Sequence, residues 1–480
     1  MKRYFDSKSG AEFNQFLTFD DVLLVPKRSA VYSRKDAQTS TRLTRNIDLN
    51  IPLVSANMDT VTEGNMAKAM ARAGGIGIIH RFMSAEDEAR EVERVKRSEG
   101  LVVEKPYTIT SDKTLRDVRK FIEKIGISGI VVVDGKNKVV GMITRRDILF
   151  EENDKGLVKD LMTSPAITAR WPVTAEKAKK ILHENRIEKL PIVDDKGLLR
   201  GLITATDIEK KALHPYSIKD KKGQLLVGAS IGVNEEYLNR TGMLLDAGAD
   251  AIVVDIAHGH NERAIEAVRA LRKNFKRIEI IAGNVATPQG TIDLIKAGAD
   301  AIKVGIGPGA TCITRIVTGV GIPQLSAIQL CTAAAKKYGV PVIADGGIRT
   351  SGDMAKAIAA GAETIMIGSL VAGTEEAPGD YILDGGAAYK VYRGGASRES
   401  FEDKLRKENK KSDGLYRAPE GKSGRVPYRG EVAGVLKDLM AGFRSSMSYL
   451  GAKDITTFQK NAEFIRITEA GRKESTAHGV

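Results

Sequence analysis

A glycine-rich segment that contains a cysteine is the part of the sequence best suited to covalent chemistry. It reads GIGPGATCITR and spans residues 305–315. Its glycines let the backbone fold tightly and turn amides or carbonyls toward a ligand or an ion. Cys312 lies in this segment, close to donors that stabilise a thiolate, which is the nucleophilic form. Cys331, in the predicted helix QLCTAAAKKY, fits a buried small hydrophobic residue better. The sequence therefore predicts Cys312 as a nucleophile.

Two further glycine-rich turns are suited to binding a phosphate. ADGGIR (344–349) and IGSLVAG (367–373) each end a short apolar run. Backbone N–H groups and helix N-termini at such positions commonly bind phosphate, although turns of this kind also occur without a ligand. Asp345 is an alternative contact there, as an acceptor for a ribose hydroxyl.

The segment from about 380 to 430 has the composition of a long loop. It holds YRGGAS at 392–397, a charged stretch at 398–415 and YRAPEGKSGRVPYRG at 416–430. Long loops without periodicity in a compact domain are usually lids or disordered segments. The repeated Tyr-Arg-Gly and a Glu flanked by Pro and Gly favour a mobile lid over the strand ends. Ordinary surface disorder is the alternative.

The elements that must position these residues repeat along the chain as apolar runs and helix-period stretches. Continuous apolar strands that alternate with amphipathic helices predict a parallel sheet covered by helices. Eight such units predict a (β/α)8 barrel, whose active site lies at the C-terminal strand ends, and disfavour an open doubly wound sheet. AGAD or AGAE precedes three runs, at 247–250, 297–300 and 360–363. The eight runs span residues 51–59, 75–80, 225–232, 251–259, 278–287, 301–309, 340–347 and 364–373.

A second repeat interrupts the first. VVVDGKNKVVGMITRRDI (131–148) matches PIVDDKGLLRGLITATDI (191–208) at a constant offset of 60 residues. We therefore expect a separate domain at 97–213, inserted into a barrel formed by 1–96 and 214–480. It resembles a tandem pair of cystathionine-β-synthase-type (CBS) modules, in which the Gly-x-x-Thr-x-x-Asp turn holds an adenine nucleotide. The alternative role for the two aspartates is to cap the following helices, and both roles are compatible. The candidate nucleotide contacts are Thr144, Asp147, Thr204 and Asp207.

The composition limits the class of protein. The chain has 480 residues and a net charge of +13, but aromatic residues make up only 5%, so no basic, aromatic stripe for nucleic acid is expected. Its two cysteines indicate a reducing compartment rather than a disulfide framework. No apolar run approaches the roughly 18 residues of a membrane span, and the N-terminus lacks a signal-peptide core. We expect a cytoplasmic protein with no membrane segment and no dedicated nucleic-acid site.

Several motifs together closely resemble the inosine monophosphate (IMP) dehydrogenase and guanosine monophosphate (GMP) reductase family. The resemblance covers nearly the whole chain, including the CBS pair. The motifs appear in the family's order and are LTFDDVLLVP (17–26), SANMDT (55–60), IAHGH (256–260), AGNVAT (282–287), GIGPGATCITR (305–315), DGGIRTSGD (345–353) and EGKSGRVPYRG (420–430).

This resemblance implies roles for individual residues. Cys312 would add to C2 of the purine, Thr314 would assist proton movement, and hydride would pass between C2 and a nicotinamide. Asp345 would bind the ribose, and Glu420 would contact the base. The other implied substrate contacts are Ser55, Gly346, Gly347, Gly368, Ser369, Tyr392 and Gly394. The implied contacts to the nicotinamide cofactor are Asp255, Gly305, Ile306 and Gly307.

The resemblance also implies partners. The cofactor would be NAD, or NADPH in a reductase. The carbonyls of Gly307, Gly309 and Cys312 would bind a potassium ion, and Glu474 and Ser475 of a neighbouring subunit would complete that site. A site shared in this way implies a ring of subunits, typically a tetramer and in some cases an octamer. Adenine or guanine nucleotides would be effectors at the CBS pair.

One departure from the family pattern concerns the lid. In the dehydrogenases an Arg-Tyr pair stands about 14 residues before the purine-contacting Glu, and its Arg is the base for hydrolysis of the thioimidate. Arg406 has this spacing from Glu420, but Lys407 follows it instead of Tyr. YRAPEGK resembles the reductase lid, whereas much of the remaining chain resembles the dehydrogenase. The favoured interpretation is an NAD-dependent IMP dehydrogenase. The alternatives are an NADPH-dependent GMP reductase and a non-catalytic nucleotide-sensing protein.

Overall fold

The computed structural model describes residues 15–99, 102–103, 106–234, 236–407 and 418–476. Two compact units are present. The first comprises residues 1–96, 216–219 and 225–480, and the second comprises 97–215 and 220–224. None of the helices within the described ranges is long and apolar enough to cross a membrane.

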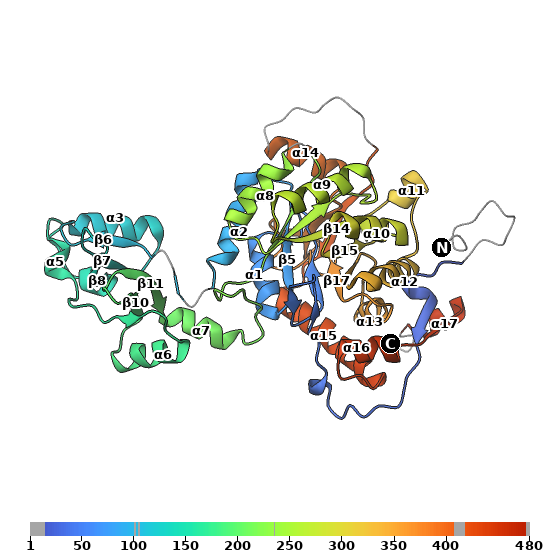
Figure 1. Ribbon diagram of the computed structural model, residues 1–480, viewed down its shortest axis with the longest axis horizontal. Coiled ribbons are helices and arrows are strands. Elements are labelled where there is room, and N and C mark those ends of the chain that lie inside the picture. Colours follow the sequence, from blue (N-terminus) through green and yellow to red (C-terminus); the bar gives the residue numbers. More distant parts are fainter. Residues whose placement is uncertain (1–14, 100–101, 104–105, 235, 408–417, 477–480) are drawn as a thin grey trace. The chain divides into compact units, whose positions relative to one another are not determined.

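A closed eight-stranded parallel barrel forms the centre of the first unit, as the apolar runs predict (Figure 1). Neighbouring strands follow one another around the ring in chain order, and β17 closes it against β4. Strands such as β5 and β12 are buried along their whole length, which explains their continuous apolar character. The barrel strands are β4 (Leu53–Ser55), β5 (Ile76–Ile79), β12 (Gly228–Ile231), β13 (Ala251–Asp255), β14 (Glu279–Val285), β15 (Ala301–Val304), β16 (Val342–Asp345) and β17 (Thr364–Ile367).

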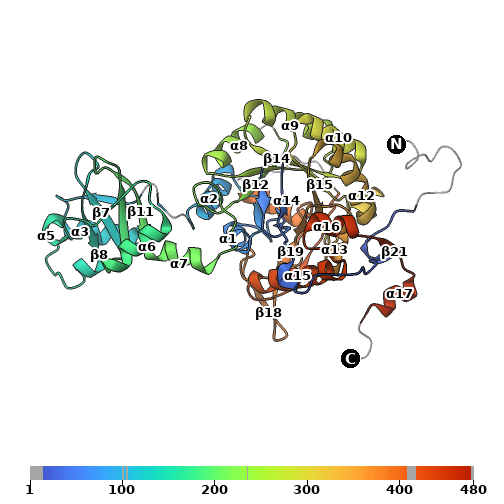
Figure 2. The same ribbon diagram turned by 60° about the horizontal axis from the view of Figure 1, so that its bottom comes forward.

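Helices surround this ring, and Figure 2 shows α8, α9, α10 and α12 along one side of it. Cys331 lies inside α12 and is fully buried, as its helical context predicts. The helices of the unit are α1 (Gly64–Ala73), α2 (Ala85–Lys96), α8 (Tyr237–Asp246), α9 (Glu262–Asn274), α10 (Pro288–Ala297), α11 (Thr314–Thr318), α12 (Gln324–Ala335), α13 (Ser351–Ala359), α14 (Arg398–Lys407), α15 (Val432–Tyr449), α16 (Ile455–Asn461) and α17 (Glu469–Glu474). The remaining strand pairs are β1 (Val22–Leu24) with β21 (Phe464–Arg466) and β2 (Thr41–Arg42) with β3 (Asp48–Leu49).

The repeated AGAD and AGAE sequences have a common structural role. Each acidic side chain lies directly before one barrel strand and accepts a hydrogen bond from a backbone N–H at the start of the neighbouring strand. The donor–acceptor pairs are Val227 with Asp250, Ile280 with Asp300 and Val342 with Glu363, at 2.9, 3.0 and 2.9 Å. A cation neutralises each carboxylate: Lys96, Arg272 and Arg42, respectively. The motif therefore fixes the register between neighbouring strands at the N-terminal end of the barrel.

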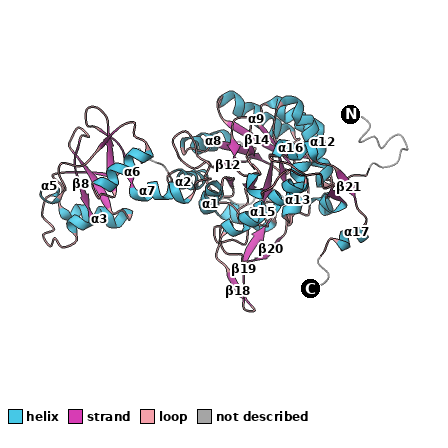
Figure 3. Ribbon diagram, turned by 90° about the horizontal axis from the view of Figure 1, so that it is seen from below, coloured by secondary structure: helices cyan, strands magenta, loops and turns pink. Residues whose placement is uncertain are grey.

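The segment at 380–430 contains regular structure, so the prediction of a loop without periodicity is wrong for its described parts. It holds α14 and an antiparallel sheet of β18 (Ile382–Asp384), β19 (Ala387–Arg393) and β20 (Ser423–Pro427). Figure 3 shows these three strands extending away from the barrel. Lys390 and Tyr392 are buried on one face of β19, and the charge of Lys390 hid this alternation in the sequence.

The second unit realises the 60-residue repeat as two similar halves. Each half has a three-stranded sheet, and the longer strands of the halves differ in position by 60 residues. A register shift also recurs at the same place, after Val132 and after Ile192. The first half contains β6 (Thr108–Thr110), α3 (Leu115–Ile125), β7 (Gly129–Val133), β8 (Val139–Thr144), α4 (Arg145–Ile148) and α5 (Val158–Leu161). The second contains β9 (Ala169–Arg170), α6 (Ala175–Glu184), β10 (Lys189–Val193), β11 (Leu199–Thr204) and α7 (Ala205–Leu213).

Candidate active site

The loop after β15 presents Cys312 at the C-terminal end of the barrel. The Cys312 N–H donates to the Gly309 carbonyl at 3.1 Å, which folds the loop back on itself. Its sulfur lies 3.1 Å from the Thr314 hydroxyl, and the side chain is half-buried. The Ile313 N–H donates to the Glu420 carbonyl at 2.8 Å, so the segment that contains Glu420 crosses this loop. The thiol is thus accessible and has one hydroxyl partner.

A cavity of about 240 Å³ opens beside Cys312. Residues from separate parts of the chain line it, because the C-terminal ends of parallel barrel strands meet at one edge. It brings together most of the predicted catalytic and substrate-binding residues. Those that line it are Cys312, Asp345, Gly346, Gly347, Gly368, Ser369, Tyr392, Gly394 and Glu420, and Gly309 of the predicted metal site lines it as well.

Asp345 is held in place by three polar side chains. Lys303 and Asn284 donate to its Oδ2 atom at 2.6 and 2.9 Å, and Gln324 donates to its carbonyl at 3.0 Å. Lys303 is almost fully buried inside β15, so its charge interacts strongly with the carboxylate. This arrangement leaves Asp345 Oδ1 as an acceptor at the cavity.

The glycine at 305 allows two strand ends to approach each other closely. Gly305 has a φ of +155°, and a Cβ atom there would lie 2.0 Å from the Asp345 carbonyl oxygen. Asn284 also donates to the Gly305 carbonyl at 2.8 Å. Any side chain at this position would therefore separate the loop of Cys312 from Asp345.

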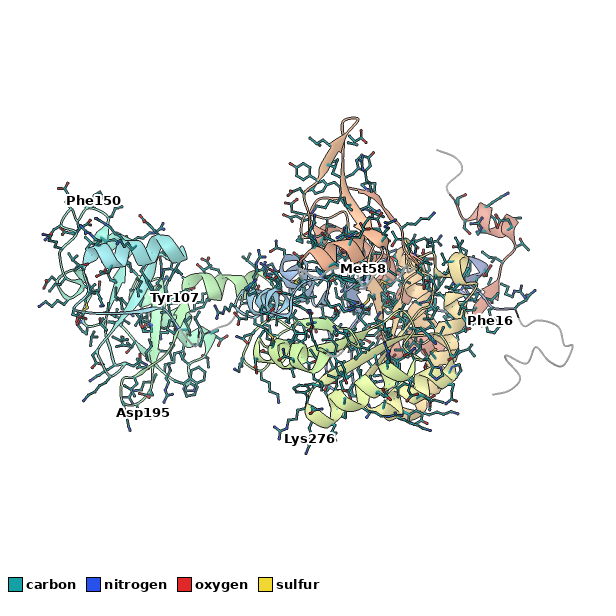
Figure 4. The ribbon with its side chains drawn as sticks, turned by 90° about the horizontal axis from the view of Figure 1, so that it is seen from above. Phe16, Met58, Tyr107, Phe150, Asp195 and Lys276 are labelled. Carbon is teal, nitrogen blue, oxygen red and sulfur yellow. The ribbon has the colours of Figure 1, made fainter. Side chains whose placement is uncertain are left out.

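Tyr392 forms one wall of the cavity. Its side chain is buried beside Met58, which Figure 4 labels where the strands β18–β20 approach the barrel. Burial raises the pKa of Tyr392 to about 12, so the hydroxyl stays protonated at neutral pH. A Cβ atom on Gly368 would lie 3.0 Å from this hydroxyl. The hydroxyl and the Gly368 backbone thus face the same space, where they can donate to an anionic group.

The predicted cofactor contacts lie outside the lining of this cavity. Asp255 ends β13 and accepts from the Arg81 guanidinium at 3.1 Å. Burial alone would raise the pKa of Asp255, but the charges of Arg81 and Lys303 hold it below its ordinary value. The carboxylate is therefore ionised and suited to accept ribose hydroxyls. Gly305, Ile306 and Gly307 follow β15 on the same end of the barrel.

Three of the predicted catalytic and substrate-binding residues do not line the cavity. Thr314 stays next to it through its contact with the Cys312 sulfur. Ser55 ends β4 but is fully buried, and its hydroxyl accepts from Thr62 at 2.8 Å. Arg406 lies on α14, where its side chain is 81% exposed and pairs with Asp403. The side chain of the adjacent Lys407 lies outside the described residues. Spacing along the sequence does not determine the direction in which the side chains of Ser55 and Arg406 point.

The predicted metal site combines backbone carbonyls with acidic and hydroxyl groups. Gly307, Gly309 and Cys312 supply neutral carbonyl oxygens, the type of ligand that potassium takes in proteins. Three oxygens do not replace a full hydration shell, so further ligands are needed. Glu474 and Ser475 are exposed at the end of α17. No group of three or more His, Cys, Asp or Glu side chains among the described residues is arranged to hold a metal.

One pair of the predicted nucleotide contacts in the second unit, Thr144 and Asp147, makes a capping interaction. Asp147 Oδ2 accepts from the Thr144 N–H at 2.7 Å and from its hydroxyl at 2.8 Å. Asp147 thus completes a capping box from inside α4, with Thr144 as the N-cap, instead of capping a helix that follows it. Thr204 ends β11, and the side chain of Asp207 lies outside the described residues. Nucleotide binding at these residues stays a prediction.

Comparison with known proteins identifies the family. The model of the IMP dehydrogenase / GMP reductase domain matches residues 16–478. The chain is 52% identical to an inosine-5′-monophosphate dehydrogenase of Nitrosopumilus maritimus, over 98% of this chain and 99% of the relative. It is 49% identical to one of Aquifex aeolicus, over 97% and 95%. The structure of a cysteine-to-alanine variant of GMP reductase from Trypanosoma brucei, in complex with guanosine 5′-monophosphate, matches with a TM-score of 0.91 and 42% identity, covering 98% of this chain and 100% of that one. This chain belongs to the IMP dehydrogenase / GMP reductase family.

Proposed function

We propose that the chain oxidises IMP to xanthosine monophosphate (XMP) with NAD, through a covalent adduct at Cys312. The observation that carries this proposal is the half-buried Cys312 thiol, 3.1 Å from the Thr314 hydroxyl, at a cavity that also contains Asp345 and Glu420. Relatives that are about half identical over nearly the whole chain and bear the dehydrogenase name support the same direction of reaction.

The chemistry requires a nucleophile before hydride transfer. The Cys312 thiolate adds to C2 of the purine, which makes that carbon tetrahedral and allows its hydrogen to leave as hydride. NAD, when bound, accepts this hydride. A thioimidate between Cys312 and C2 remains. Water then adds at C2, the C–S bond breaks, and the cysteine is regenerated with release of XMP. Thr314 is placed to exchange a proton with the sulfur.

The other residues orient the nucleotide. Asp345 would accept the ribose hydroxyls, and backbone N–H groups from Gly346 to Gly347 and at Gly368 and Ser369 would bind the phosphate. Tyr392 would add a hydroxyl donor, which is protonated at neutral pH. Glu420 makes no hydrogen bond to another described side chain and faces the cavity, which suits a contact to the purine.

The second candidate is reduction of GMP to IMP with release of ammonia, with NADPH as donor. One observation favours it: Arg406, the basic residue at the family's spacing from Glu420, is exposed on α14 and paired with Asp403. The Trypanosoma brucei relative bears the reductase name. The dehydrogenase needs a base for water, whereas the reductase does not hydrolyse an adduct.

One assay separates these candidates. The full chain is mixed with IMP and NAD, and separately with GMP and NADPH, while absorbance of the reduced nicotinamide is followed. An increase with IMP alone is expected, and a decrease with GMP alone would reverse the assignment. Cys312→Ala is the control for both, since it removes the nucleophile but leaves the rest of the cavity. Turnover by Cys312→Ala would favour neither reaction, and IMP binding without turnover by the unmodified chain would favour a nucleotide-sensing protein.

Assembly and regulation follow as further proposals. The carbonyls of Gly307, Gly309 and Cys312 would bind potassium, with Glu474 and Ser475 of a neighbouring subunit completing the site in a tetramer. Such an ion would stabilise the loop that carries the nucleophile. The second unit would bind adenine or guanine nucleotides and change the activity or the formation of octamers. The chain would act in the cytoplasm. Mass measurements in potassium and sodium buffers, with and without nucleotide, test these points.

A further inference from the structure

One guanidinium joins three separate parts of the first unit behind the substrate cavity. Arg393 ends β19, and its Nε atom donates to Asp59 Oδ2 at 2.8 Å. Its Nη2 atom lies 2.6 Å from the same oxygen and donates to Asp403 Oδ2 at 2.7 Å. Asp59 lies in the loop after β4, and Asp403 lies on α14. The backbone N–H of Arg393 donates to the Thr60 hydroxyl at 3.2 Å.

The carboxylate at the centre of this network depends on Arg393. The Asp59 side chain is only 1% exposed. Its Oδ2 atom accepts from Arg393 and from the Ser400 hydroxyl at 3.1 Å. Its Oδ1 atom is buried and has no hydrogen-bond partner within the part of the chain that the structure describes. Arg393 is the cation paired with Asp59, because the single hydroxyl of Ser400 cannot neutralise a buried carboxylate.

The network lies directly behind residues that face the nucleotide. Tyr392 and Gly394 flank Arg393 in sequence and both line the cavity. Since successive side chains on a strand point to opposite faces, the Arg393 guanidinium points away from the cavity that Tyr392 faces. After the end of β19, the Gly394 N–H donates to the Lys422 carbonyl, and the Glu420 N–H donates to the Ala396 carbonyl, each at 3.1 Å. The end of β19 is therefore tied on one side to the ion pairs and on the other to the segment that contacts Cys312.

We infer that Arg393 is a positioning residue for the nucleotide site. By pairing with Asp59 and Asp403, it holds Tyr392 and Gly394 in the positions that nucleotide binding in the cavity requires. This inference rests on the proposed function, in that a purine nucleotide occupies the cavity. Arg393 itself does not line the cavity and is not a catalytic residue. Its two acidic partners are far apart in sequence, so the guanidinium couples the barrel to α14.

The test separates positioning from folding by removing both charges together. Arg393→Gln alone leaves Asp59 buried without a cation and is expected to destabilise the fold. In the double variant Arg393→Gln with Asp59→Asn, no buried charge is left unpaired, so the thermal midpoint Tm should return close to that of the unmodified chain. The glutamine amide is shorter than the guanidinium and cannot reach both position 59 and Asp403, so affinity for IMP should stay roughly 10- to 100-fold weaker. Recovery of both Tm and IMP affinity in the double variant would overturn the inference.

A second readout does not need a nucleotide. Amide hydrogen exchange in residues 394–397 and 420–422 should be at least about tenfold faster in the double variant, whereas exchange in α12 should not change. Arg425→Gln is the matched control, because Arg425 forms an exposed ion pair with Asp384 in the same small sheet. Unchanged exchange at 394–397 would also overturn the inference. If the unmodified chain fails to bind IMP, the proposed function fails, and the exchange result still decides the role of Arg393.

Discussion

The substitution Gly368→Ala tests where the phosphate binds. Gly368 follows β17 and has no left-handed φ, so alanine adds a methyl group without straining the backbone. The new Cβ atom would lie 3.0 Å from the Tyr392 hydroxyl and 3.4 Å from the Met58 sulfur. The first distance is tighter than an ordinary contact, so Tyr392 must shift, and the methyl group would occupy part of a cavity of about 240 Å³.

The expected effect on binding can be estimated from the hydrogen bonds lost. A hydrogen bond to a charged group contributes about 1.5–3 kcal/mol. Loss of one such bond to the phosphate raises the dissociation constant of IMP roughly 10- to 150-fold. The assay is calorimetric titration of the full chain with IMP, with Tm recorded on the same samples to show that the fold is intact.

A matched glycine provides the control for this experiment. Gly424 lies on β20 with open space around its Cβ position and no left-handed φ. Gly424→Ala should therefore bind IMP like the unmodified chain. If Gly368→Ala also binds IMP as tightly as the unmodified chain at an unchanged Tm, the phosphate does not bind at Gly368.

Three further predictions concern stability and thiol reactivity. Burial raises the pKa of Glu88 to about 8 in spite of its contact with Arg240. Between about pH 5 and 8 the folded chain therefore holds a proton at Glu88 that the unfolded chain has lost, so Tm should fall as the pH rises through this range. Glu88→Gln should make Tm depend less on pH. Asp300→Ala should lower the free energy of unfolding by about 2 kcal/mol in a denaturant titration, since the buried Ile280 N–H loses its acceptor; Arg272 keeps the Gly298 and Ile278 carbonyls as acceptors. A thiol reagent should label Cys312 alone in the native chain, because Cys331 is fully buried and burial raises its pKa to about 12; equal labelling of both cysteines would contradict this.

The barrel could be predicted from the sequence because most residues of its strands are apolar and follow one another in short runs. β5 and β17 are buried on both faces, so no charged residue interrupts the pattern. The AGAD motifs could be recognised as repeats. That their aspartates accept hydrogen bonds from a neighbouring strand could not be predicted, because this depends on the register between two strands, which the sequence of one strand does not contain. The two halves of the 60-residue repeat could likewise be matched from the sequence, but the match does not indicate which strands pair within each sheet.

The side chains that hold the site were harder to predict. Lys303 stands within the apolar run AIKVG, and Asn284 within AGNVAT, and neither motif alone shows that both side chains meet Asp345. A charged residue in a fully buried strand was the available signal, since such a residue is rarely buried without a partner. Arg406 was predicted as a catalytic residue only from its spacing to Glu420, and residues 408–417 between them lie outside the described structure.

These differences have one physical origin. A residue at or directly after the end of a parallel strand is placed by the strand itself, so Asp345 and Gly368 converge because their strands share an edge of the barrel. The loop after β15 brings Cys312 to the same edge. An ion pair has no such local rule: Asp59 and Arg393 are 334 positions apart, and only the folded chain brings them within hydrogen-bond distance. Residues that touch the nucleotide can therefore be found from motifs at strand ends, whereas residues that set their exact distances must be sought among buried charges, where removing one partner costs the most.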